Sequence, residues 1–99
     1  MSKLTIRHSV SADRAELARL SVLDSARPPR GPALVAEADS RMLAALPLGA
    51  GRPIADPFEP TAEIVALLEL RAAQLEREAD GRASLADRLR SLFRYPARA

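Results

Sequence analysis

The segment at residues 27–32 constrains the fold more than any other part of this 99-residue chain. Its sequence is RPPRGP, and this density of proline and glycine excludes both a helix interior and a central strand. The chain before it carries Leu17, Leu20 and Leu23 at helical spacing, whereas the chain after it alternates between apolar and other residues and then turns. We therefore predict a loop at 27–32, with a helix before it and hairpin strands after it.

The N-terminal part predicts a strand and a helix. Residues 3–7 (KLTIR) alternate and include β-branched side chains, so we expect a short first strand. Ser9 or Ser11 is suited to cap the helix that follows, and Asp13 and Glu16 lie near its positive end. We expect this helix to end near residues 24–25.

The middle of the chain predicts consecutive antiparallel strands. Residues 33–38 and 41–48 form a hairpin around Asp39-Ser40, and residues 49–51 (GAG) form a second turn. Residues 52–58 follow as a short extended segment. Pro47 and Pro53 flank the second turn and cannot donate a ladder hydrogen bond, so we expect this last hairpin to be short or to lie at the sheet edge.

The C-terminal part predicts two helices. Thr61 is a good cap for the first, which we expect to run to about Ala79 and to stop at Gly81. Ser84 would open a second helix with Asp87 in the capping-box position, and Pro96 would end it. The leucines of this second helix are expected to cover the core, and its arginines to be solvated.

The predicted order is therefore β-α-β-β-β-α-α. Consecutive hairpins favour an antiparallel sheet, so we expect an α+β fold in which helices pack on a small, mostly antiparallel sheet. We predict one domain at residues 1–82, with a basic amphipathic helix and tail at 83–99 packed on it or extending it.

Composition limits the core and the chemistry. The apolar residues are mostly Ala and Leu, with Phe58, Phe93 and Tyr95 as the aromatics, so we expect a thin core that is helped by a partner subunit or by well-packed helices. The absence of cysteine excludes disulfides, thiolate zinc sites and thiol catalysis. The first ten residues are polar and no apolar run approaches the ~20 residues that span a bilayer, so we expect a cytoplasmic protein.

Several segments in order carry a family resemblance: Leu4-Thr5-Ile6-Arg7, Asp13 with Leu17, Leu34-Val35-Ala36-Glu37 and Ala44-Ala45-Leu46. Two more are Leu23-Asp24-Ser25-Ala26 and Ala55-Asp56-Pro57-Phe58-Glu59-Pro60-Thr61. Together they resemble the N-terminal half of the GNAT superfamily of N-acetyltransferases over about residues 3–78. The resemblance implies a sheet whose fourth strand leads into an acetyl-CoA site.

The matching position departs from that family's pattern. GNAT enzymes have a loop of the form Q/R-x-x-G-x-G/A there, whose backbone N–H groups bind the cofactor's pyrophosphate. This chain has DPFEPT at residues 56–61, without glycine and with two prolines and two acids. Cofactor contacts carried over by position would fall on Ile54, Ala55, Asp56 and Thr61. The family's fifth strand also has no counterpart in residues 80–99, so only a second chain could complete the cleft.

Four residues are candidates for catalysis, and none receives a role. Asp56 and Glu59 could form a carboxylate pair, but acids are favoured at a solvated helix start. His8 could be a general base, yet it follows a strand and no metal-ligand spacing surrounds it. Tyr95 matches the family's catalytic tyrosine in residue type only, because it follows the last helix.

Three functions are therefore kept open. The first is a non-catalytic GNAT-like domain that acts by protein contact, as a homo-oligomer or with another protein. The second is an acetyl-CoA-dependent N-acyltransferase whose site is completed by a second chain. The third is a module that binds nucleic acid or an anionic surface through Arg82, Arg88, Arg90 and Arg94.

Overall fold

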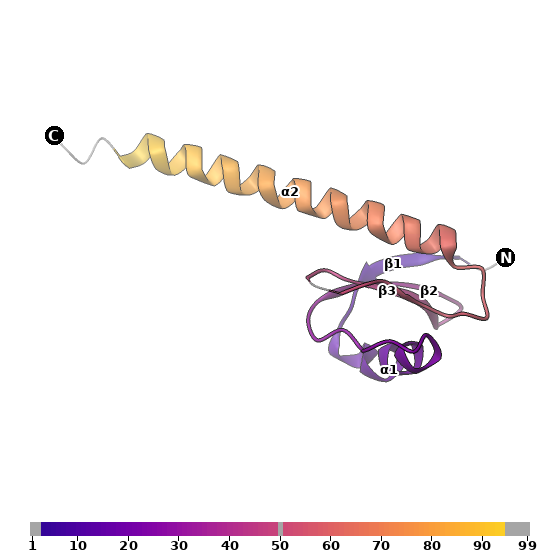
Figure 1. The fold of residues 1–99 in the computed structure, drawn as a ribbon. Coiled ribbons are helices and arrows are strands. Elements are labelled where there is room, and N and C mark those ends of the chain that lie inside the picture. Colours follow the sequence, from indigo (N-terminus) through magenta and orange to yellow (C-terminus); the bar gives the residue numbers. More distant parts are fainter. Residues whose placement is uncertain (1–2, 50, 95–99) are drawn as a thin grey trace.

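The computed structural model describes residues 3–49 and 51–94, which form one antiparallel sheet between two helices (Figure 1). The strands are β1 (Thr5–His8), β2 (Ala33–Ala38), β3 (Arg41–Pro47) and β4 (Ile54–Ala55), paired in chain order. The short 3-10 turn η1 (Ser11–Asp13) leads into α1 (Arg14–Leu23), and α2 (Ala62–Arg94) follows β4. The predicted α+β class with an antiparallel sheet is confirmed.

The central hairpin follows the predicted boundaries, except that β3 ends at Pro47, one residue before the predicted end. β2 covers residues 33–38 and pairs with β3 from Ala33 opposite Pro47 to Ala38 opposite Arg41, with a bulge at Ala36/Glu37. Asp39 and Ser40 form the turn with φ values of 54° and 62°. Positive φ at both central residues is the geometry that matches the twist of the two strands.

The sheet is covered on both faces, so its core has two parts. On one face, Leu20 of α1 packs with Val35, Met42, Ala45 and Ile54. On the other, Leu68 of α2 packs with Leu34, Ala36, Ala44 and Leu46. Successive residues such as Leu34 and Val35 point to opposite faces of the sheet, and each face is covered by a helix. This explains why β2 and β3 are apolar nearly throughout.

The two helices predicted at the C-terminus are one. α2 runs without a break from Ala62 to Arg94, and Gly81 lies inside it. A side chain at Gly81 would meet nothing within 4 Å, so nothing there forces the chain out of the helix. Glycine weakens a helix interior by only about 1 kcal/mol relative to alanine, and Ala79, Arg82 and Ala83 close to it are good helix formers. The prediction of a stop at Gly81 was therefore wrong.

Two other predicted details differ. Neither serine caps the first helix, because Asp13 occupies its N-cap and the Ser9 hydroxyl accepts from the amide of Ala33 instead (3.2 Å). The predicted extended segment at 52–58 contains a two-residue strand, β4, followed by a turn. Its brevity agrees with the prolines that flank the preceding turn.

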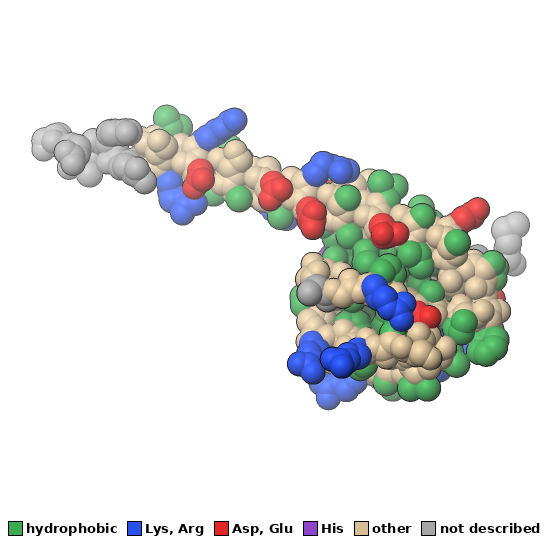
Figure 2. Space-filling view, in the orientation of Figure 1, with side chains coloured by type: hydrophobic (Ala, Val, Ile, Leu, Met, Phe, Trp, Pro, Cys, Tyr) green, Lys and Arg blue, Asp and Glu red, His purple; other side chains and the backbone are tan. Residues whose placement is uncertain are grey.

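The far part of α2 extends well away from the sheet. The molecule measures 66 × 28 × 21 Å, with a radius of gyration of 18.2 Å, whereas a compact chain of this length would have about 13 Å. We call residues 80–94 the arm and residues 3–79 the body. Residues 80–92 of the arm are all exposed, and Figure 2 shows the arm projecting beyond the body.

Candidate functional site

The junction between β4 and α2 is where the resemblance places the cofactor loop, and its backbone donors are already in use. The amide of Asp56 donates to the carbonyl of Leu43 (2.9 Å), and that of Glu59 to the carbonyl of Asp56 (3.3 Å). The amide of Phe58 donates to Oδ1 of Asp56 (2.9 Å). Pro57 and Pro60 have no N–H to offer. Residues 56–60 therefore present no free amide to an anion.

Asp56 itself is buried at 0% exposure, whereas Glu59 is exposed. Oδ2 of Asp56 lies 3.4 Å from Nη2 of Arg41 and 3.9 Å from Nη1 of Arg19. The Asp56 carboxylate is held between two arginines and an amide, so the expectation that it belongs to a solvated loop was wrong. Its contacts come from α1 and β3, which the local sequence does not indicate.

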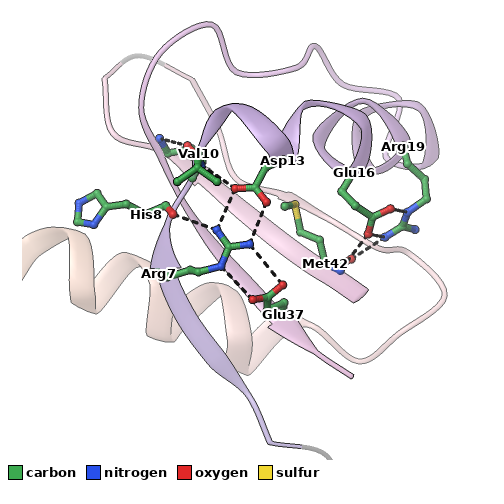
Figure 3. A network of polar contacts seen from close by, with 10 residues as sticks. Arg7, His8, Val10, Asp13, Glu16, Arg19, Glu37 and Met42 are labelled. Carbon is green, nitrogen blue, oxygen red and sulfur yellow. Dashed lines mark hydrogen bonds and ion pairs between the residues drawn. The ribbon is translucent and has the colours of Figure 1, made fainter. Parts of the chain in front are cut away.

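Arg19 and Glu16 connect α1 to the backbone of β3 (Figure 3). Nε of Arg19 donates to Glu16 (2.8 Å) and Nη2 to the carbonyl of Met42 (2.7 Å), while the amide of Met42 donates to Glu16 (3.1 Å). The hydrogen bond from Arg19, followed by that from Met42, lowers the pKa of Glu16. The same hydrogen bond raises the pKa of Arg19. Both groups stay charged near neutral pH, which suits a structural contact and not proton transfer.

A second cluster connects β1, β2 and the turn before α1 (Figure 3). Arg7 makes two hydrogen bonds to Asp13, both 2.9 Å, and two to Glu37 (2.9 and 3.4 Å). Asp13 also accepts from the amide of Val10 (2.7 Å). The bonds from Arg7 and then Val10 lower the pKa of Asp13 to about 2, and the two carboxylates raise the pKa of Arg7 well above its ordinary value. Asp13 thereby ties the start of α1 to β1, although its side chain makes no capping hydrogen bond to α1.

A hollow of about 700 Å³ lies beside the β4–α2 junction. Its lining includes four carboxylates, from Asp24, Asp56, Glu59 and Glu63. Asp24 also accepts from the amide of Ala55 (3.2 Å) and pairs with Arg52 (3.6 Å). Of the positions to which the resemblance carried cofactor contacts, Ile54 is buried in the core, and Ala55, Asp56 and Thr61 border this acidic hollow. Its charge disfavours a pyrophosphate.

The remaining candidate residues do not assemble into a catalytic group. His8 is exposed at the end of β1, in a shallow hollow that Glu76 and Arg82 of α2 also line. Within residues 3–49 and 51–94, no three side chains of His, Asp and Glu come together as a metal site. Tyr95 lies outside the described residues.

The arm carries the basic residues and a set of exposed leucines. Arg82, Arg88 and Arg90 are exposed, and Arg90 pairs with Asp87 at 3.0 Å; α2 ends at Arg94. The arginine spacing distributes them around the helix instead of along one face. The prediction that the leucines of this segment cover the core was wrong. Leu85, Leu89 and Leu92 are exposed, because α2 extends past the sheet before it reaches them.

Comparisons with protein-family models, curated proteins and solved structures give no match to this chain. Among the residues described, neither helix is long and apolar enough to cross a membrane.

Proposed function

We propose that this chain is a non-catalytic GNAT-like domain that acts by contact with other proteins. The observation that carries the proposal is the row of five exposed leucines on α2: Leu67, Leu70, Leu85, Leu89 and Leu92, exposed by 45% to 69%. Exposed apolar side chains of this size on one element are typical of a surface that another protein covers.

The geometry of the β4–α2 junction supports the absence of acetyl-CoA chemistry. A pyrophosphate needs free backbone N–H groups and a positive environment. Here the amides of residues 56–60 are absent or engaged, and the adjacent hollow is lined by carboxylates. Moving the buried Asp56 aside would also break the ion pairs that it makes with Arg19 and Arg41.

The resemblance remains the basis for naming the family in this proposal. Four antiparallel strands in chain order, with a helix after the first and another after the fourth, are compatible with the front half of that fold. The arrangement of the sheet says nothing by itself about activity. The leucines support action by protein contact, and the junction supports the absence of catalysis.

The test is isothermal titration of the full chain with acetyl-CoA, with CoA as the control ligand, at low salt. We expect no heat of binding from a protein that circular dichroism shows to be folded. Micromolar binding of either ligand would contradict the proposal and favour an N-acyltransferase completed by a second chain.

A second candidate function is binding to nucleic acid or an anionic surface through the arm. Residues 80–94 contain four arginines and two acids, and three of these arginines are exposed in the structure. This excess of positive charge favours binding to phosphate groups. Deleting residues 82–99 would then abolish binding to single-stranded DNA and to phosphatidylserine vesicles. Equal binding by the truncated and full chains would refute it.

A further inference from the structure

We propose that the partner of α2 is a second copy of this chain, with the two α2 helices packed antiparallel in a symmetric dimer. The inference rests on the proposed function, since it names the protein that covers the exposed leucines. It is carried by two properties of α2: the spacing of those leucines and the distribution of charge along the helix.

The leucines lie along one side of α2 and are spaced symmetrically. Leu85 follows Leu67 by five turns of about 3.6 residues, so both project from the same side, and Leu89 and Leu92 continue that stripe. The midpoint of the pair Leu67 and Leu92 falls between residues 79 and 80. The midpoint of the pair Leu70 and Leu89 falls at the same place. A two-fold axis there brings Leu67 against the partner's Leu92 and Leu70 against the partner's Leu89.

The charges of α2 are opposite in its two halves. Residues 62–79 contain four glutamates and two arginines, whereas residues 80–94 contain two aspartates and four arginines. In an antiparallel pair, each basic arm lies along the acidic half of the other copy, and the helix dipoles also oppose each other favourably. A parallel pair would place like charges together. The acidic hollow at the start of α2 adds to this attraction, because the end of the partner's arm would lie near Glu63.

The centre of the proposed interface favours a close approach. Gly81 lies next to the two-fold axis, and a Cβ added there would meet nothing within 4 Å, so this stretch of helix is open to a second chain. The same register brings Arg71 towards the partner's Arg88, but Arg71 is already paired with Glu78 at 3.8 Å. The local repulsion is therefore reduced.

The first test is sedimentation equilibrium of the full chain over a roughly hundredfold range of concentration. We expect a monomer–dimer equilibrium for the native chain. For the double variant Leu85→Glu, Leu89→Glu, we expect the dimer dissociation constant to rise at least tenfold. Val22→Glu is the matched control, because Val22 is 79% exposed on α1 of the body and should leave the dimer intact.

The second test determines the orientation, and the absence of native cysteine makes it clean. Leu67→Cys and Leu92→Cys chains are oxidised separately and as a mixture. We expect the mixture to give a crosslinked dimer and each chain alone to give at least several times less. Crosslinking of each chain alone at the level of the mixture would indicate a parallel pair and overturn the inference.

The two proposals can fail independently. A native chain that remains a monomer at every concentration overturns the second copy as partner and leaves the non-catalytic domain in place. Binding of acetyl-CoA overturns the proposed function whatever the oligomeric state.

Discussion

The body and the arm are built from similar residues but meet different surroundings. In the body, β2 and β3 are covered on both faces, by α1 and by the first part of α2. In the arm, the same helix continues with leucines and alanines, yet its described side chains are all exposed. An apolar helical stripe thus predicts that something covers it without saying whether that something is the same chain.

The arm keeps its helical form for local reasons. Ala, Leu and Arg, which make up most of it, have high helix propensity, and the pair Arg90–Asp87 bridges one turn. An isolated helix of this length is marginal in water. The packed first part of α2 supplies the nucleus from which the arm continues, so body and arm differ in stability while sharing one helix.

The largest expected difference between the two regions lies in leucine truncation. Leu34→Ala removes a buried side chain from beneath α2 and should lower the free energy of unfolding by about 3 kcal/mol. Leu85→Ala in the arm should change it by less than about 0.5 kcal/mol. Urea unfolding of both variants at low protein concentration measures this, and equal losses would mean that the arm packs on the body.

The next effect concerns Asp56, a charged group that belongs to the body. Asp56→Ala should cost about 2–3 kcal/mol, because Arg19 loses its buried partner and the amide of Phe58 loses its acceptor. Glu59→Ala, three residues further on and exposed, is the control and should be nearly neutral. Thermal unfolding compares the two, and a neutral Asp56→Ala would show that its ion pairs contribute nothing.

A smaller effect depends on pH. The pKa of Asp13 is about 2 in the folded protein, below its ordinary value of 3.8, so its stabilisation is complete above about pH 4 and is lost as pH falls from there towards 2. We expect about 1–2 kcal/mol, since Arg7 is one-third exposed and solvent screens the pair. Asp13→Asn should flatten the pH dependence of unfolding in this window. An unchanged acid limb would contradict the assignment.

The smallest effect would sharpen the boundary between body and arm. In the monomer, at low protein concentration, Gly81→Ala should stabilise the arm by about 0.5–1 kcal/mol, because alanine suits a helix interior better than glycine and its Cβ would meet nothing within 4 Å in the single chain. Hydrogen exchange should slow in residues 80–94 and stay unchanged in the strands. Slower exchange throughout would indicate that the two regions unfold together.

Sequence reasoning succeeded where the signals were local. The alternation at residues 33–38, the Asp39-Ser40 turn and the RPPRGP loop each predicted the observed element or connection. It failed at Gly81, because glycine marks a helix end only when the chain also leaves the helix, and nothing after Gly81 requires that. Thr61 was correctly placed at the start of the long helix. The amide of Val65 donates to the carbonyl of Thr61 (2.8 Å).

The candidate site was harder to predict because its contacts are long-range. Asp56 is buried and forms ion pairs with Arg19 of α1 and Arg41 of β3. Neither the spacing of these arginines in the sequence nor the residues beside them indicate that they contact Asp56. The sequence did show that residues 56–61 lack glycine and contain two prolines. It could not show that the remaining amides are occupied, since their acceptors include the carbonyl of Leu43 on β3.

The alanines at the centre of the sheet have a thermal consequence. Ala33, Ala36, Ala44 and Ala45 are all fully buried, in positions where larger apolar side chains would be usual. Alanine has no rotamer freedom to lose, so ordering these positions costs little entropy. They also bring less apolar surface out of water, which reduces the heat-capacity change of unfolding. The stability of this domain should therefore change less with temperature than that of an equally long chain with an aromatic core.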